Sequence, residues 1–499
     1  MNIKAMLNAL RVPLTQELFT SLSTLDLFEL FRGRSCPFFL DSSMDPQKLG
    51  RWSFMGADPF LVMSSRGRSI TLKEGKAVAR SRGNPFDVLA EKLAQFRLEA
   101  STSGVRLNGS PQGDARATGN GAVPPFTGGA VGYLSYDLLH FIERVPGTAM
   151  NDIQVPESYL GFYDLVLAHD NLLGKTYVVS TGFPELEESR RLKRARERLD
   201  EFKSRLSRMR PVARAPFGPV PGKMTLQGNF THESYVKAVA RARQYIIDGD
   251  IFEVNISQRF QTTLTIPPWE LYLRLRNINP APFASYLDFG DVTIVSASPE
   301  RFLRVEGDYV ETRPIKGTAR RGRTPEDDRE LARELMGSIK DHAENMMIVD
   351  LERNDLGRIC RYGSVRVTEL AILETFPTVH HLTSTVVGRL LPGKTAADLL
   401  KVAFPGGSIT GAPKIRSMEI IDELEPTRRS VYTGSIGYFG FNGNMDTNIV
   451  IRTFIIKGKR AWFQVGGAVV YDSDPEAEYR ETMDKGRALI NALSITEPK

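Results

Sequence analysis

The sequence predicts an α+β fold, in which antiparallel strands are interspersed with separate helices. Residues 292–315 and 434–471 each consist of apolar, β-rich runs interrupted by short turns, among them Glu306-Gly307-Asp308 and Asn442-Gly443. Strands that are joined by such short turns run antiparallel. We therefore expect two antiparallel meanders in the C-terminal half, the second of which contains a strand from Asn448 to Ile456.

Helices are expected at four places in the same half. One begins at about His232, behind Thr231 as a plausible N-cap. Three others begin at Thr324-Pro325, near Pro413 and at Asp474-Pro475. Each of these three has proline in its first turn, where a missing N–H costs nothing because that group has no partner within the helix.

Length and composition indicate a folded chain with more than one core. With 499 residues, the chain exceeds the ~250–300 residues at which single cores usually stop growing. Its 41% hydrophobic and 25% charged residues are near the averages for soluble proteins. No stretch approaches the ~18 apolar residues of a membrane helix, and Arg11 and Pro13 stand where a signal peptide would be apolar. We expect a cytoplasmic protein without a membrane partner.

The net charge of +6 comes from one segment. Between Ser189 and Arg214, eleven Lys or Arg stand against three acids, so the rest of the chain is slightly acidic. Because the basic excess is local and fits a solvated surface helix, a nucleic-acid partner is not expected. Prolines and glycines after this helix indicate a linker at 207–226, between an N-terminal region at 10–206 and a C-terminal domain at 227–495.

Two pairs of acidic residues have a spacing that could hold a metal. Asp341 and Glu344 are three residues apart on an expected helix, so both carboxylates leave the same face, and Glu478 and Glu481 repeat this spacing. If the pairs face each other across a cleft, their oxygens suit Mg²⁺, with waters completing the octahedron. The alternative is a solvated acidic face, which is common on surface helices. Lys485, four residues after Glu481, could pair with it or bind a substrate anion.

Glycine-rich segments and an arginine indicate a site for a small anion. Residues 405–414 form a glycine-rich turn before a helix N-terminus, where free N–H groups favour an anion. Gly466 and Gly467 lie inside an apolar strand, where glycine is unfavourable unless another group approaches closely. Arg452 alternates with its neighbours in the expected strand, and its guanidinium could hold a carboxylate with two hydrogen bonds. Each signal by itself is more often structural than functional.

Several longer motifs resemble those of the chorismate-utilising enzymes. They are Ser298-Pro299-Glu300, DHAENMMIVDLERN at 341–354, GGSITGAPK at 406–414, Asn444-Met445-Asp446-Thr447 and Ile451-Arg452-Thr453. The resemblance is strong over about 228–493 and weaker before it. It implies a fold of antiparallel β-sheets wrapped by helices, like that of anthranilate synthase component I, with the C-terminal domain as the chorismate-binding catalytic part. It also implies a requirement for Mg²⁺.

A few positions indicate the branch of this family. Lys316, in Pro314-Ile315-Lys316-Gly317-Thr318, resembles aminodeoxychorismate synthase component I, whereas anthranilate synthases typically carry alanine there. The isochorismate-forming branch activates water with a lysine at the position of Glu253, where relatives that use ammonia usually carry glutamine. Glu253 matches neither pattern. The expected activity is conversion of chorismate and ammonia to 4-amino-4-deoxychorismate, for 4-aminobenzoate and folate synthesis.

The resemblance also implies roles for individual residues. Lys316 would be the nucleophile, with its pKa lowered by Arg313 or Arg320 and by partial burial. Glu300 would protonate the leaving hydroxyl, with its pKa raised by nearby acidic residues. Mg²⁺ would be held by Glu344 and Glu481, and through water by Asp341 and Glu478. The residues that would anchor the substrate are Arg452, Lys485, Tyr432, Thr410, Gly466, Gly467 and His381.

The chain lacks a recognisable source of ammonia. A glutamine amidotransferase needs a nucleophilic cysteine, and neither Cys36 nor Cys360 lies in a suitable motif. We therefore expect a separate glutamine amidotransferase subunit as partner. Anthranilate synthase component I is the main alternative, and a non-catalytic chorismate-binding protein is an alternative of another class. Phe39-Leu40-Asp41-Ser42 resembles the family's tryptophan-binding strand, but the sequence does not decide whether tryptophan binds.

Overall fold

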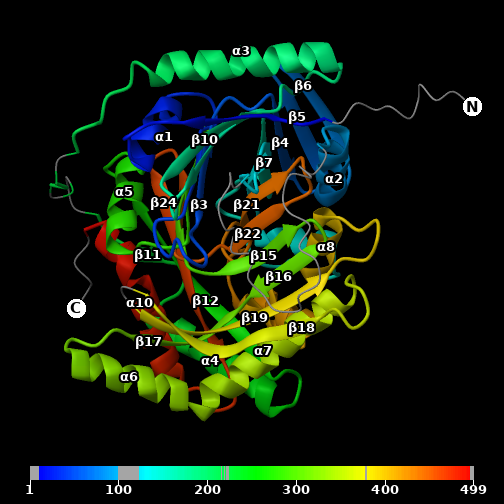
Figure 1. The fold of residues 1–499 in the computed structure, drawn as a ribbon. Helices are drawn as coiled ribbons and strands as arrows, with labels where there is room; N and C mark the ends of the chain where they lie inside the picture. The colour runs from blue at the N-terminus through cyan, green and yellow to red at the C-terminus, as the bar shows by residue number, and fades with distance from the viewer. Residues whose placement is uncertain are drawn as a thin grey trace, which may run out of the picture.

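Two large antiparallel sheets form the centre of the molecule. The computed structural model describes residues 11–98, 123–214, 216–218, 220, 224–376 and 379–494. Within these residues each sheet has twelve strands, and every neighbouring pair is antiparallel. The α+β fold predicted from the sequence is therefore confirmed (Figure 1).

The first sheet combines strands from both halves of the chain. In spatial order it contains β1 (Leu14–Leu18), β10 (Lys175–Ser180), β9 (Leu165–Asp170), β3 (Trp52–Gly56), β2 (Phe38–Asp41), β13 (Phe283–Asp288), β14 (Thr293–Ser298), β23 (Thr453–Lys457), β24 (Arg460–Val469), β12 (Glu253–Thr263) and β11 (Gln227–Gly228), with β20 (Gly411–Ala412) also paired to β12.

The second sheet also combines strands from both halves of the chain. It contains β17 (Ile315–Arg320), β19 (Val379–Arg389), β16 (Tyr309–Arg313), β15 (Arg301–Glu306), β22 (Met445–Ile449), β21 (Ser435–Gly440), β7 (Gly129–Leu134), β8 (Ser158–Tyr163), β4 (Leu61–Arg66), β5 (Ser69–Glu74) and β6 (Ala77–Arg82), with β18 (Arg366–Thr375) paired to β19. The linker expected at 207–226, part of which lies outside the described residues, thus connects two stretches of chain that complete the same sheets.

Helices cover the outer faces of the sheets. They are α1 (Thr24–Arg32), α2 (Pro85–Gln95), α3 (Glu188–Leu206), α4 (His232–Ile247), α5 (Pro268–Ile278), α6 (Pro325–Gly337), α7 (Ile339–Gly357), α8 (Ala396–Ala403), α9 (Lys414–Leu424) and α10 (Pro475–Ala492), with short 3₁₀ turns at Tyr136–Phe141 and Gly407–Ile409. Thr231 caps α4 as expected. The helices expected at Thr324-Pro325 and Asp474-Pro475 begin there, with Thr324 and Asp474 as their N-caps, whereas Pro413 is itself the residue before α9. No described helix combines the length and the hydropathy needed to cross a membrane.

The apolar core has layers because successive residues of a strand face opposite sides. In β2, Phe38 belongs to a cluster between the two sheets, whereas Phe39 packs with α1 and α5 on the outer face. In β7, Val131 faces the inner cluster and Ala130 the outer face of the second sheet, which α2, α7 and α8 cover. Strands buried on both faces appear in the sequence as continuous apolar runs, which explains the lack of alternation in much of this chain.

One expected strand is two strands in different sheets. Asn448 to Ile456 was predicted to be continuous, but β22 ends at Ile449 in the second sheet and β23 begins at Thr453 in the first. Arg452, at the crossing, has a left-handed backbone with φ of 54°. The prediction was wrong because both strands are largely buried on both faces, so that no alternation in the sequence reveals the change of sheet.

The basic helix is only partly solvated. Figure 1 shows α3 along one end of the molecule, with α6 at the opposite end. Arg191 is fully buried and donates to the carbonyl of Thr181 at 2.7 Å, and Arg198 pairs with buried Asp164. Part of the local positive charge therefore holds this helix against the first sheet.

A buried ion pair connects the glycine-rich turn to β12. Arg429 and Glu425 are both about 2% exposed, and two guanidinium nitrogens of Arg429 donate to the Glu425 carboxylate at 2.7 and 3.0 Å. The same guanidinium donates to the carbonyls of Ile409 at 2.9 Å and of Asn255 at 2.7 Å. Arg429 thereby fixes the turn at 406–412 against the start of β12.

Replacing Arg429 by alanine is expected to lower the free energy of unfolding by about 3–5 kcal/mol, because Glu425 would remain buried without its partner charge. Urea unfolding followed by circular dichroism measures this change. Arg353 pairs with Asp350 at 2.8 Å on the surface, and its replacement by alanine serves as the control, with an expected loss below about 1 kcal/mol. Equal losses in the two variants would contradict the prediction.

Candidate functional site

Lys316 and Glu253 form a buried ion pair between the two sheets. Lys316 lies in β17, which pairs with β19 in the second sheet, and Glu253 is the first residue of β12 in the first sheet. The Lys316 amine donates to Glu253 Oε1 at 2.5 Å. Glu253 is fully buried, Lys316 is 7% exposed, and Glu253 Oε2 has no hydrogen-bond partner among the described residues.

The electrostatic environment of Lys316 differs from the expectation. Burial lowers the pKa of Lys316, but the negative charges of Glu253 and Glu344 outweigh burial, so the net shift of this pKa is upward. The predicted lowering by Arg313 or Arg320 is wrong. Arg313 donates to Thr385, Glu369 and Glu374, and Arg320 pairs with Asp327. In the absence of substrate, Lys316 is therefore an ammonium group.

Glu300 has the protonation behaviour of a general acid. It lies directly before β15 and is buried, and burial raises its pKa to about 7, although Ser408 Oγ donates to it at 2.6 Å. The raised pKa agrees with the expectation, but its cause is burial and not nearby acidic residues. Lys316 lies close enough for its charge to lower the pKa of Glu300, which places both groups at one site.

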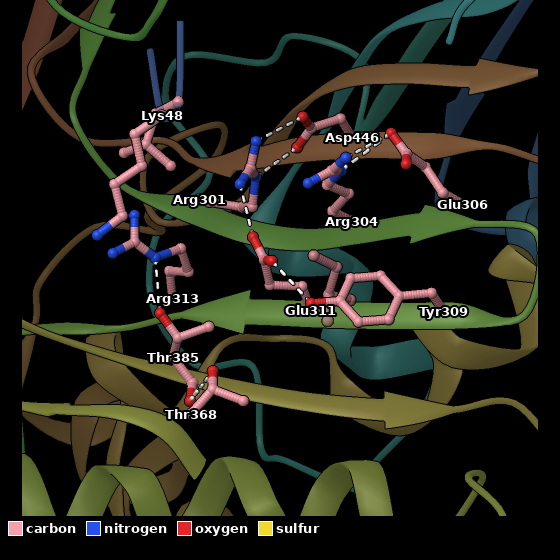
Figure 2. A network of polar contacts seen from close by, with 12 residues as sticks. Lys48, Arg301, Arg304, Glu306, Tyr309, Glu311, Arg313, Thr368, Thr385 and Asp446 are labelled. Atoms are coloured by element: carbon pink, nitrogen blue, oxygen red, sulfur yellow. Dashed lines mark hydrogen bonds and ion pairs between the residues drawn. The ribbon is translucent and has the colours of Figure 1, made fainter. Parts of the chain in front are cut away.

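Ion pairs behind the site hold the strands that carry these two residues (Figure 2). Arg301, next to Glu300, donates to both carboxylate oxygens of Asp446 at 3.0 Å and to Glu311 at 2.7 Å, which connects β15 with β22 and β16. Arg313 donates to Thr385 Oγ1 at 2.8 Å just before β17 begins. The network fixes the backbone next to both Glu300 and Lys316.

The first carboxylate pair lies on α7 beside β17. Asp341 packs against Gly317, where an added Cβ would come within 3.1 Å of the Asp341 carboxylate. Burial raises the pKa of Glu344 to about 7, and Glu344 Oε1 has no hydrogen-bond partner among the described residues. Lys340 lies 3.8 Å from that oxygen. This pair is therefore turned towards the site and is not a solvated acidic face.

The second pair lies on α10 beside β24. Ser473 Oγ donates to Glu478 Oε1 at 2.7 Å, while Oε2 of the same buried carboxylate has no partner among the described residues. Burial and the neighbouring charge of Glu481 raise the pKa of Glu478. The side chain of Glu481 is half exposed. Although partial burial raises the pKa of Glu481, its ion pair with Lys485 at 2.5 Å, together with the charges of Lys340 and Lys316, outweighs burial and lowers this pKa.

The four acids have the donor chemistry that Mg²⁺ requires. Unpaired carboxylate oxygens of Glu344 and Glu478 are the hard, charged ligands that this ion prefers. Lys340 interacts electrostatically with Glu344, Glu478 and Glu481, so α7 and α10 present their carboxylates to a shared positive charge. No three acidic, histidine or cysteine side chains of the described part of the chain are gathered closely enough to hold a metal. The residues therefore fit the ion in the chemistry of their oxygen atoms alone.

Gly466 and Gly467 lie where other groups approach β24 closely. A Cβ at Gly467 would come within 2.9 Å of Glu478 Oε2, and one at Gly466 within 3.0 Å of the Tyr432 hydroxyl. Lys485 donates to the carbonyl of Gly466 at 3.2 Å. The sequence expectation of close approach at these glycines is therefore confirmed.

Two further residues expected to bind the substrate, Arg452 and Tyr432, also lie near β24 or its neighbour Lys485. Arg452 does not follow the strand alternation expected for it, because it precedes β23 at the crossing between the sheets. Its guanidinium donates to the carbonyl of Lys485. Burial lowers the pKa of Arg452 to about 10, which still leaves it charged at neutral pH. Burial raises the pKa of Tyr432 to about 12, so its hydroxyl remains a donor.

The side chains of Thr410 and His381 each make a hydrogen-bond contact with another residue of this chain. Thr410 Oγ1 donates to the carbonyl of Gly406 at 3.0 Å, within the glycine-rich turn. His381 Nδ1 lies 2.8 Å from Thr318 Oγ1. Burial, together with the charge of Arg452, lowers the pKa of His381 to about 3, so this histidine is neutral.

Two residues near the site were missed by the sequence reasoning. Ser408 provides the hydrogen bond to Glu300, and Glu352 accepts the N–H of Gly407 at 3.1 Å from below the turn. Burial raises the pKa of Glu352. Both residues lie inside the motifs quoted above, but only the folded chain shows which atoms they contact.

Comparison with known proteins agrees with this geometry. The sequence profile of a family described as chorismate binding enzyme matches residues 58–491. Anthranilate synthase component 1 of Cereibacter sphaeroides is 38% identical over 486 residues, which cover 96% of this chain and 93% of that protein. Aminodeoxychorismate synthase component 1 of Salmonella typhimurium is 41% identical over 445 residues, which cover 89% of this chain and 90% of that protein.

A solved structure gives the same result for the fold. The crystal structure of anthranilate synthase component I from Streptococcus pneumoniae matches with a TM-score of 0.72 at 32% identity, covering 88% of this chain and 91% of that one. The relatives carry names from two activities, so the comparisons establish the family and not the specific product. The fold, the site and the relatives together identify this chain as a chorismate-utilising enzyme that belongs to the chorismate-binding family.

Proposed function

We propose that this enzyme is aminodeoxychorismate synthase component I, which forms 4-amino-4-deoxychorismate from chorismate and ammonia for 4-aminobenzoate and folate synthesis. The observation that carries the proposal is the position of the Lys316 amine. It is buried between the sheets, and the charges of Glu253, Glu344 and Glu300 all act on it. A lysine held at such a site is placed to attack a bound substrate, whereas anthranilate synthases typically carry alanine at the matching position.

The proposed reaction begins with displacement of the ring hydroxyl. Glu300 donates a proton to this hydroxyl, which is otherwise a poor leaving group. The neutral Lys316 amine attacks the ring carbon next to the carboxylate-bearing carbon, the double bonds shift, and water leaves. Ammonia then attacks the carbon that lost the hydroxyl and displaces Lys316. The enolpyruvyl group is retained, in contrast to anthranilate formation.

Cations and backbone amides would hold the dianionic substrate. Arg452 and Lys485 lie beside β24 and carry the positive charge that its carboxylates need. Tyr432, Thr410, His381 and the amides of Gly466 and Gly467 would complete the pocket. Each of these residues comes from 227–495, so we propose that region as the catalytic domain, although strands from the N-terminal region complete both sheets.

Mg²⁺ is the proposed cofactor. Glu344 and Glu481 would hold it directly, and Asp341 and Glu478 through water. When bound, the ion would supply positive charge to the ring carboxylate and draw electron density towards it. The unpaired oxygens of Glu344 and Glu478 support this assignment.

Ammonia is proposed to come from a separate glutamine amidotransferase subunit in the cytoplasm. Burial raises the pKa of Cys360 to about 11 and also raises the pKa of Cys36, so neither thiol is activated as a nucleophile. The relatives' names as component 1 support the existence of a partner. Free ammonia at high concentration should replace that partner in the reaction.

Product analysis tests the proposal. Incubation of the purified enzyme with chorismate, Mg²⁺ and ammonium salts should yield 4-amino-4-deoxychorismate without pyruvate, and chelation of the metal should stop the reaction. Chromatography with mass spectrometry identifies the product, and a lactate dehydrogenase assay detects pyruvate. Fluorescent anthranilate with equimolar pyruvate would instead assign the activity of anthranilate synthase, and a failure to consume chorismate would indicate a binding protein.

The Lys316→Ala variant should lose at least about 100-fold of the ammonia-dependent rate, because the nucleophile is removed. The initial rate of aminodeoxychorismate formation measures this loss. Lys340→Ala is a suitable comparison. It removes a half-exposed lysine that lies beside Glu344, and it leaves the proposed nucleophile in place. Unchanged activity of Lys316→Ala would exclude Lys316 from the mechanism.

The activity should also depend on the protonation of Glu300. A general acid works only when protonated, and because the pKa of Glu300 is raised to about 7, kcat/KM for chorismate should fall above about pH 7. The profile is measured with the concentration of free ammonia held constant. Glu300→Gln should lose about 10²- to 10⁴-fold in rate and should lack this alkaline limb. A wild-type profile that is flat from pH 7 to 9 would be inconsistent with this role.

A further inference from the structure

Glu253 is the one carboxylate within hydrogen-bond distance of the Lys316 amine in the described part of the chain. It is held rigidly, because Ser417 Oγ donates to its carbonyl at 3.0 Å and β20 pairs with the start of β12. Asn255 Nδ2 donates weakly to Oε1 at 3.3 Å. Oε2 is buried without a partner among the described residues, which leaves the carboxyl group able to accept a proton.

We infer that Glu253 is a further catalytic residue of the proposed reaction, and that its carboxylate takes the proton from the Lys316 ammonium group so that the free amine can attack. The inference rests on the proposed function, since it requires Lys316 to be the nucleophile. It concerns a position where this chain departs from relatives that use ammonia, because those usually carry glutamine, which cannot accept a proton.

The proton balance of this reaction closes without any other reactant. Lys316 passes a proton to Glu253 and becomes a neutral amine. The amine bonds to the ring as the C–O bond breaks, and the hydroxyl leaves as water with the proton of Glu300. Ammonia displaces Lys316, its new C–N bond replacing the one to lysine, and the resulting ammonium group returns a proton to Glu300. Glu253 then gives its proton back to Lys316.

Other charged groups also face this pair and set the conditions of the transfer. Glu344 from α7, Glu300 from the start of β15 and Glu481 from α10 all interact electrostatically with Lys316. These charges favour the ammonium form, so solvent would be a poor acceptor for its proton near neutral pH. An acceptor in direct contact with the amine removes that barrier, and general bases of this kind contribute about 10²- to 10⁴-fold to rates.

The test compares Glu253→Gln with the wild type across the pH range. The glutamine keeps the size of the side chain but cannot accept a proton, so Lys316 must lose its proton to solvent. With free ammonia held constant, the ratio of kcat in the variant to kcat in the wild type should be about 0.1 or less at pH 7 and should rise as the pH increases. KM for chorismate should stay within about threefold. Because both enzymes contain Glu300, the ratio removes the effect of Glu300 protonation on the pH profile.

Two controls separate this role from packing. Glu253→Asp retains a carboxylate, so its ratio should be reduced but independent of pH. Asp170→Asn likewise replaces a carboxylate by an amide, at a fully buried residue of β9 that is paired with Arg51 at 2.8 Å. The ratio of kcat for this variant should also be independent of pH. If Glu253→Gln does not fold, Glu253→Ala takes its place: a ratio that is low at pH 7 and rises with pH supports the inference, and a ratio independent of pH overturns it.

The possible results distinguish the role of Glu253 from the proposed function. Aminodeoxychorismate formation by the wild type, with a pH-independent ratio for Glu253→Gln, would overturn the role of Glu253 and leave the proposed function intact. A ratio above 1 at pH 7 would do the same, because it would mean that Glu253 only suppresses the nucleophile by holding its proton. Anthranilate formation by the wild type would overturn the proposed function, and the role of Glu253 with it.

Discussion

The buried contact between Lys316 and Glu253 is the interaction on which the site depends. It joins β17 of one sheet to β12 of the other, so it marks a place where the two sheets present polar side chains to each other. Moving two charges out of water costs several kcal/mol per ion, and a buried pair is retained only with good geometry. Here one carboxylate oxygen has that geometry, and the other is buried with no partner among the described residues.

Burial of both faces of each sheet determines where such a site can lie. The inner cluster between the sheets and the outer clusters beneath the helices are apolar, and the charged groups of the site lie at or beside strand ends and on the helices packed against them. The starts of β17 and β12 are such strand ends, and α7 and α10 cover them with acidic side chains. The crossing between β22 and β23 adds Arg452 from a position that belongs to neither strand.

Opposite pKa shifts within this small region give its groups different chemical states. Burial raises the pKa of Glu300 and of Glu344 to about 7, whereas pairing with Lys485 outweighs burial and lowers the pKa of Glu481. His381 is kept neutral by burial, and Lys316 is kept protonated by its acidic neighbours. Neighbouring carboxyl groups whose pKa values are shifted in opposite directions are typical of functional sites.

The order of residues alone was enough to predict the family, the α+β class and the identity of the polar residues, because long motifs and capped helices are local properties of the chain. Thr231 was recognisable as a cap from its neighbours, and the prolines after Thr324 and Asp474 marked two further helix starts. The division of Asn448 to Ile456 between two sheets emerged only in three dimensions, because strands buried on both faces carry no alternation that would reveal the change. The charge state of Lys316 also depended on the folded chain. Arginines stand close to Lys316 in the sequence. In the folded chain, however, the carboxylates whose charges raise its pKa come from β12 and α7. A pKa depends on such distances in space, which cannot be read from the spacing of residues along the chain.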